Sequence, residues 1–114
     1  MACPLDYSLC QQTVTVYRKQ ESGVLRQVIG GCYFEHRDKR TGTLTGNEQE
    51  RSFLLIMPGN IQRVFPGDRV IEGVGPVVTQ WEYFVPETVA GLVEVEYTMP
   101  CYWENAICHV EAGR

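Results

Sequence analysis

Short segments of strand character, separated by glycine, proline and polar residues, constrain the fold of this chain more than any other feature of its sequence. No window of a dozen residues keeps apolar side chains at positions i, i+3, i+4 and i+7, which is the spacing of an amphipathic helix. The strand-like segments are 13–19, 24–29, 53–57, 69–74, 77–85, 92–98 and 105–112. They predict a mostly β fold, a small antiparallel β-barrel or β-sandwich of about six to eight strands with one long polar loop.

Glycine and proline mark the places where the predicted strands turn. The sequence "QESG" joins segments 13–19 and 24–29 as a hairpin. Gly30 and Gly31 interrupt a strand pattern, which indicates a bulge or a sharp corner. The nearly continuous apolar run 53–57 predicts a central strand covered on both faces. Pro66 and Gly67 predict a β-turn.

The length and charge of the chain limit its organisation and its partners. The 114 residues, of which 44% are hydrophobic, fit a single β-rich domain over 1–114, with 1–12 as an N-terminal arm. The net charge is −4 and neither half is basic, which argues against a protein that grips phosphate backbones. No apolar run approaches the ~18 residues of a membrane span, and the N-terminus lacks a basic signal region. We therefore expect synthesis in the cytoplasm and no membrane contact.

The segment 37–50, "RDKRTGTLTGNEQE", has a different composition from the rest of the chain. It lacks the regular spacing of apolar residues seen in the strand-like segments, and it contains charged residues, threonine and two spaced glycines instead. This composition predicts a long exposed loop. Its basic beginning is more typical of a solvated hairpin base than of a nucleic-acid site.

Five cysteines and two histidines raise the question of thiol or metal chemistry. The cysteines are Cys3, Cys10, Cys32, Cys101 and Cys108, an odd number without an export signal, so we expect free thiols. Cys32 and His36 share a face of a predicted strand but lie about 13 Å apart, too far to ligate one zinc ion. The seven-residue spacing of the other four cysteines is wider than a structural zinc knuckle. We expect no metal and no cofactor.

Catalytic arrangements are equally weak in the sequence. Cys108 and His109 are adjacent on a predicted strand, so their side chains should diverge, with Cys108 buried and His109 nearer water. Glu94 and Glu96 alternate with Val93 and Val95, which is typical of a strand with one solvated face. We predict that the protein is not an enzyme.

Aromatic residues offer an alternative function. Trp81, Tyr83, Phe84, Tyr102 and Trp103 resemble in composition the stacking platforms of single-strand binders, although alternating aromatics are more often core. A small β-barrel that binds nucleic acid or another ligand therefore remains the alternative hypothesis.

The order of the segments carries a family resemblance. The succession "TVTVYRK", "LRQVIGGCYFEHR", a polar loop, "FLLIMPG", "FPGDRVIEG" and "CHVEAGR" resembles small minor structural proteins of tailed bacteriophages and prophages. These are head-to-tail connector or head-closure components of the stopper type. The resemblance runs from about Thr13 to Arg114, through short apolar motifs, although Val110 stands where family members often carry an aromatic residue.

The resemblance implies a non-enzymatic virion protein that forms part of a ring between portal and tail and helps to close the DNA channel. The implied partners are portal or adaptor proteins, tail proteins, further copies of the chain, and packaged double-stranded DNA in passive contact. A polar loop from each copy is the part of such a ring that reaches the channel or a partner. The candidate contact residues are Arg37, Lys39, Arg40, Thr41, Thr43, Thr45, Asn47 and Glu48.

Overall fold

The computed structural model describes residues 7–37, 39–43, 46–50 and 52–114, and for 39–43 and 46–50 it describes the backbone alone. Nine strands are present in this part of the chain, with no α-helix. They are β1 (Gln12–Gln20), β2 (Gly23–His36), β3 (Lys39–Thr43), β4 (Gly46–Glu50), β5 (Phe53–Pro58), β6 (Arg69–Glu72), β7 (Val93–Glu94), β8 (Tyr97–Trp103) and β9 (Ala106–Gly113). One 3₁₀ turn, η1, spans Trp81–Tyr83. The predicted mostly β fold is confirmed.

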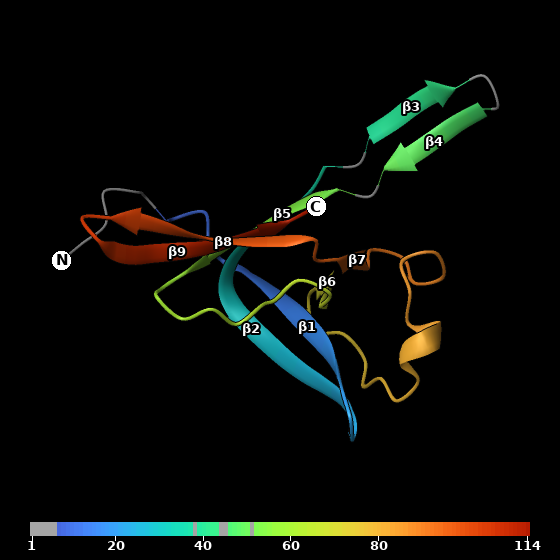
Figure 1. The fold of residues 1–114 in the computed structure, drawn as a ribbon, viewed down its shortest axis with the longest axis horizontal. Coiled ribbons are helices and arrows are strands. Elements are labelled where there is room, and N and C mark those ends of the chain that lie inside the picture. The colour runs from blue at the N-terminus through green and yellow to red at the C-terminus, as the bar shows by residue number, and fades with distance from the viewer. Residues whose placement is uncertain (1–6, 38, 44–45, 51) are drawn as a thin grey trace.

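Seven strands form one antiparallel sheet in the order β7-β6-β1-β2-β5-β9-β8, which curls into a half-barrel (Figure 1). The long strand β2 makes the curl, because its first part pairs with β1 and its last part, from Tyr33 to His36, pairs with β5. The corner lies at Gly30 and Gly31, where the β1–β2 register shifts and Gly31 has a φ of +67°. The bulge predicted at these glycines is confirmed, as is the hairpin turn before Gly23.

The two edges of the curled sheet are consecutive pieces of one strand-like segment. β7 pairs with β6, and β8 pairs with β9, at opposite ends of the strand order. Between them, Val95 exchanges backbone hydrogen bonds with the turn before β6, and the Glu96 N–H donates to the Gly113 carbonyl of β9. The short link Val95 and Glu96 therefore brings the two edges together.

The main core lies inside this curl. It is formed by buried apolar side chains from both halves of the sheet: Val14, Val16, Ile29, Cys32, Phe34, Phe53, Leu55, Met57, Val64, Val70, Val93, Val95, Val110 and Ala112. Strand β5 is central, between β2 and β9, as predicted. The prediction that both of its faces are covered is only partly right, because Phe53, Leu55 and Met57 are buried while Leu54 and Ile56 are half-buried.

The segment 37–50 is not an irregular loop. Its strands β3 and β4 pair with each other in antiparallel register, from Lys39 opposite Glu50 to Thr43 opposite Gly46. We call this hairpin the β3–β4 arm, and in Figure 1 it extends away from the curled sheet. Threonine and charged residues lack the apolar alternation that identifies a half-buried strand, so the sequence pattern missed this hairpin, whose strands form a separate two-stranded sheet.

The predicted strand over 77–85 is wrong. Residues 74–92 instead form turns and η1, which pack Phe84 and Leu92 around Tyr17 in a second, smaller cluster. Their carbonyl groups bond to side chains instead of a neighbouring strand. Arg26 donates to the Gly75 carbonyl, Tyr17 to that of Pro76, and Arg69 to those of Trp81 and Phe84. These long-range donors satisfy a backbone that would otherwise need a sheet partner.

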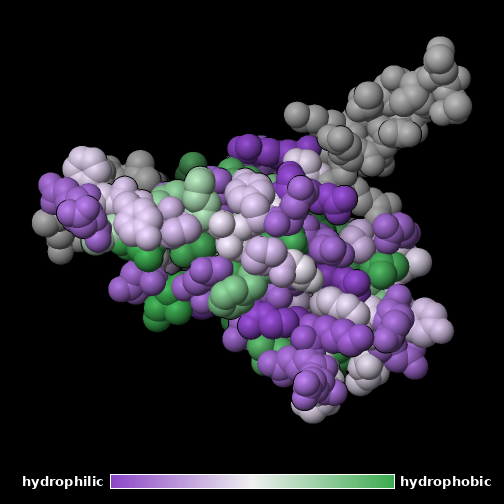
Figure 2. All heavy atoms as spheres, viewed as in Figure 1, coloured by the Kyte–Doolittle hydropathy of each residue, from purple (hydrophilic) through white to green (hydrophobic). Residues whose placement is uncertain are grey.

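No helix in the described part of the chain has the length and apolar character of a membrane-spanning segment. On the face seen in Figure 2, hydrophilic and hydrophobic residues are interspersed over the body of the molecule.

Candidate functional site

The predicted contact residues lie mainly on the β3–β4 arm. In its register Thr41 is opposite Glu48, and Gly42 is opposite Asn47. Thr45 lies outside the described residues. Arg37 precedes the arm, where its N–H donates to the Ser52 carbonyl at 2.8 Å and its guanidinium pairs with Glu35 at 3.4 Å. The backbone bond across the base holds the start of the arm next to the start of β5.

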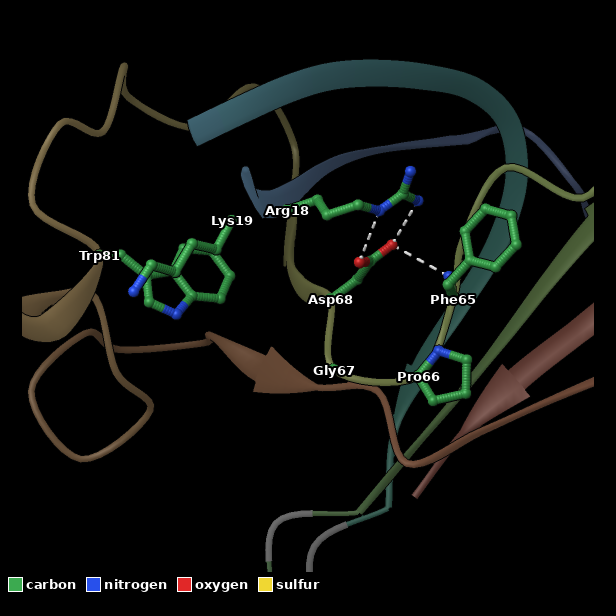
Figure 3. A pocket seen from close by; sticks show the side chains of 7 residues that line it. All are labelled: Arg18, Lys19, Phe65, Pro66, Gly67, Asp68 and Trp81. Atoms are coloured by element: carbon green, nitrogen blue, oxygen red, sulfur yellow. Dashed lines mark hydrogen bonds and ion pairs between the residues drawn. The ribbon is translucent and has the colours of Figure 1, made fainter. Parts of the chain in front are cut away.

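An open hollow of about 510 Å³ lies elsewhere, against β1 and the turn before β6 (Figure 3). It is lined by Arg18, Lys19, Phe65, Pro66, Gly67, Asp68 and Trp81. The predicted β-turn at Pro66 and Gly67 forms one wall. The Asp68 N–H donates to the Phe65 carbonyl at 3.1 Å, and Gly67 has a φ of +93°, the conformation that a type II turn requires.

Asp68 is the centre of this wall and is 2% exposed. Its two carboxylate oxygens accept hydrogen bonds from Nε and Nη2 of Arg18 at 2.9 and 2.8 Å. One of them also accepts from the Phe65 N–H at 2.9 Å. The Arg18 guanidinium lies 4.5 Å from the centre of the Phe65 ring. Its hydrogen bonds to Asp68 are the main reason that the pKa of Arg18 is raised. The carboxylate therefore holds the turn against β1 through three hydrogen bonds, two of them from a guanidinium.

A second arginine packs on Trp81, one of the residues that line the hollow. The Arg69 guanidinium lies 3.9 Å from the centre of the Trp81 ring. Its Nε is buried without a hydrogen bond and lies 3.7 Å from the Glu94 carboxylate. Arg69 therefore covers one face of Trp81, which reduces the value of this ring as a stacking platform. Glu96 pairs with Arg114 at 3.8 Å, so Glu94 and Glu96 each face a different cation.

The other candidate aromatics divide between core and surface. Phe84 is buried in the small cluster around Tyr17, with ring centroids 4.5 Å apart. Tyr83 is 75% exposed, and Tyr102 and Trp103, at the end of β8, are 63% and 45% exposed. The expectation that alternating aromatics belong to the core is therefore right for Phe84 and wrong for these three.

The adjacent residues Cys108 and His109 do not follow the predicted alternation. In the β8–β9 register Cys101 is opposite His109 and Tyr102 is opposite Ile107, so the register shifts by one residue at Cys108. This is a β-bulge, which re-aims side chains locally. Cys108, His109 and Val110 are buried in succession, and His109 is only 7% exposed. The prediction that His109 lies nearer water is wrong, because the bulge breaks the two-residue period.

The N-terminal segment covers this bulge. The Tyr7 hydroxyl shares a hydrogen bond of 2.9 Å with Nδ1 of His109, and the two rings meet edge to face at 5.6 Å. Burial, followed by the nearby Cys10 and Cys101 thiols, raises the pKa of Tyr7. Nothing in the sequence around Tyr7 indicates this contact, which joins residues 102 positions apart.

The cysteines are in two chemical states. Cys10, Cys32 and Cys101 are free thiols as predicted, whereas Cys108 is disulfide-bonded, which corrects the prediction for that residue. Cys3 lies outside the described residues. Cys32 is buried, while His36 is exposed and lies beside Phe34. Among the described residues, no three His, Cys, Asp or Glu side chains are grouped so that they could hold a metal ion.

Comparison with known proteins does not assign the chain to a family. No protein-family model matches it, and no curated protein or solved structure matches it significantly. The phage resemblance of its segment order therefore stays a prediction.

Proposed function

We propose that this chain is a non-enzymatic structural subunit of a tailed phage particle. It forms part of a ring in the head-tail connector, joins portal or adaptor proteins to tail proteins, and helps to close the DNA channel. The β3–β4 arm is the contact element of the subunit. The proposal places the protein in the virion after its synthesis in the host cytoplasm.

The observation that carries this proposal is the form of the arm. Its two strands pair only with each other in the strand pairing of the described residues, and they extend from an otherwise curled sheet (Figure 1). A two-stranded ribbon is only marginally stable in water by itself. A projecting ribbon of this kind is suited to contact a neighbouring subunit or a channel, where further contacts would stabilise it.

The charge of the chain fits passive contact with DNA. The net charge of −4 repels a phosphate backbone over a distance of about 8–10 Å at physiological salt, so DNA slides past without being gripped. The principal carboxylate of the hollow, Asp68, is already engaged by Arg18 and by the turn that it stabilises. This arrangement supports a structural role for the hollow.

Two measurements test the proposal in sequence. Quantitative mass spectrometry of density-purified particles should find the chain at a low, ring-like copy number relative to the major capsid protein. Deletion of 41–47 should then abolish particle assembly or DNA retention. A Glu21→Ala variant in the exposed β1–β2 turn is the matched control and should assemble normally.

The outcomes are separable. Absence of the chain from intact particles would reject the virion role. Presence of the chain, with normal assembly and DNA retention after the deletion, would leave the virion role and reject the role of the arm.

The alternative, a small nucleic-acid- or ligand-binding β-barrel, is favoured by the exposed rings of Tyr102 and Trp103 at the end of β8. It requires binding to single-stranded DNA at low salt that weakens as salt is raised and on Trp103→Ala. Undetectable binding at low salt would reject it for nucleic acid.

A further inference from the structure

The half of the curled sheet formed by β2, β5, β9 and β8 has an outer face opposite the main core. Residues that are opposite one another in neighbouring strands share a face, and two such rows cross this half of the sheet. The first row is Tyr33, Ile56, Glu111 and Met99, and the second is Glu35, Leu54, Gly113 and Tyr97. Leu54 and Ile56 are half-buried, whereas Tyr97 and Met99 are 40% and 48% exposed. The outer face is therefore mainly apolar and is open to solvent along β8.

The Tyr97 side chain lies across Gly113, the residue opposite it in β9. A Cβ on Gly113 would be 2.8 Å from Oη of Tyr97 and 3.0 Å from its Cε1. The Tyr97 hydroxyl reaches the next outward residue of β9 and donates a hydrogen bond of 3.2 Å to Oε2 of Glu111. Because Gly113 has no side chain, an exposed aromatic ring and a carboxylate can lie together on the outer face.

The Glu111 side chain is half-buried and has no ion-pair partner in the part of the chain that the structure describes. Its cross-strand neighbours, Ile56 and Met99, are apolar. Arg37 is close enough to lower the pKa of Tyr97, although burial and Glu111 raise this pKa overall, and its guanidinium pairs with Glu35 at 3.4 Å. A carboxylate in apolar surroundings attracts a cation more strongly than one in water, because the surroundings screen its charge less.

Two ring–carboxylate pairs elsewhere in the chain each hold an arginine of the same chain. They are Phe65 with Asp68, which hold Arg18, and Trp81 with Glu94, which face Arg69. The two guanidinium groups lie 4.5 and 3.9 Å from the ring centres. Tyr97 and Glu111 form a third pair of this kind, and no arginine among the described residues lies over its ring.

We propose that the outer face at Tyr97 and Glu111 is a docking site for a different protein, which places an arginine there. The guanidinium stacks on the exposed side of the Tyr97 ring and donates to the Glu111 carboxylate. Apolar side chains beside this arginine pack on Met99 and Ile56. Arginine fits better than lysine, because its planar group can stack on a ring and donate in a fixed fork at the same time.

Charge favours a basic partner protein over a second copy of the chain. The chain carries a net charge of −4, so two copies repel each other, whereas a basic segment is attracted. The apolar side chains around Glu111 favour a protein segment over a free cation, because a free cation has no apolar surface to bury against them. This inference goes beyond the proposed function and does not depend on it, since the docking site contains no residue of the β3–β4 arm.

Nuclear magnetic resonance of the isotope-labelled full chain tests the docking site. The probe is the blocked peptide "GSLRLSG", and the amide signals of 97–99 and 110–112 report its binding. We expect it to bind about tenfold more tightly than "GSLQLSG", with "GSLKLSG" between them. Raising the salt concentration should weaken the binding.

A variant with nearly unchanged shape tests the carboxylate itself. Glu111→Gln keeps the size of the side chain and an acceptor for the Tyr97 hydroxyl but removes the charge, so it should weaken binding of "GSLRLSG" by about tenfold. Glu87→Gln makes the same change at an exposed residue of the 74–92 segment and should bind as the native chain does.

Three results would overturn the proposal. The first is equal binding of "GSLRLSG" and "GSLQLSG" by the native chain, a comparison that needs no variant. The second is unchanged affinity for "GSLRLSG" in Glu111→Gln. The third is self-association of the native chain in sedimentation that Glu111→Gln abolishes, which would assign the outer face to a second copy instead.

Discussion

Removal of the Asp68 carboxylate should be among the most damaging single changes in the structure. Asp68→Ala deletes three hydrogen bonds at 2.8–2.9 Å, two of them from a guanidinium, at a side chain that is 2% exposed. Breaking a buried ion pair costs about 3–5 kcal/mol. The Arg18 side chain is 30% exposed and can regain part of its hydration, which lowers the expected loss to about 3 kcal/mol.

Urea unfolding measures this loss directly. With a slope of about 1.5–2 kcal/mol per M, a loss of 3 kcal/mol lowers the midpoint by about 1.5–2 M. Asp68→Asn keeps the volume and one acceptor oxygen, so it should lose about half as much. Glu82→Ala is the control, because Glu82 meets Lys19 at 3.9 Å with both side chains exposed, and such pairs contribute about 1 kcal/mol or less.

A double-mutant cycle separates the ion pair from the turn. If Arg18 and Asp68 act together, the double variant should lose less free energy of unfolding than the sum of the losses in Arg18→Ala and Asp68→Ala. The difference should be about 1–3 kcal/mol. The reasoning is refuted if Asp68→Ala changes the free energy of unfolding by no more than Glu82→Ala does. Additive losses would assign the role of Asp68 to the turn at Phe65 alone.

Two further predictions concern the buried thiol and the chain end. Burial raises the pKa of Cys32 from 9.0 to about 11. The contribution of the neutral thiol to the free energy of unfolding is therefore complete below about pH 9 and is lost as the pH rises toward 11. Urea unfolding should show a loss of about 2–3 kcal/mol across that window, and Cys32→Ala should lack this component. Gly113→Ala would place a Cβ 2.7 Å from the Phe53 carbonyl oxygen and 2.8 Å from the Tyr97 hydroxyl. It should lower the free energy of unfolding by about 1–3 kcal/mol, while Gly30→Ala, whose Cβ has 3.8 Å to its nearest neighbour, should cost much less.

The candidate site was only partly accessible from the sequence. The composition of 37–50 located the arm as a polar segment. Its pairing into β3 and β4 could not be predicted, because the segment lacks the alternating apolar residues that indicate a strand. The sequence "FPGDR" predicted the turn in the hollow, yet Arg18, 50 residues away, gives no local signal that it binds Asp68. The contact between Tyr7 and His109 is more distant still.

The sequence by itself determined the strand character, the antiparallel hairpin after β1, the corner at Gly30 and Gly31, and the turn at Pro66 and Gly67. These features depend on backbone preferences that individual residues carry with them. Tertiary structure alone decided that 77–85 is not a strand and that His109 is buried beside Cys108. The first outcome depends on Arg69, which bonds the carbonyls of Trp81 and Phe84. The second depends on the β8–β9 register, which shifts by one residue at Cys108, and on Tyr7, which lies 102 positions from His109. Local patterns cannot contain such information, because it exists only once the sheet has curled.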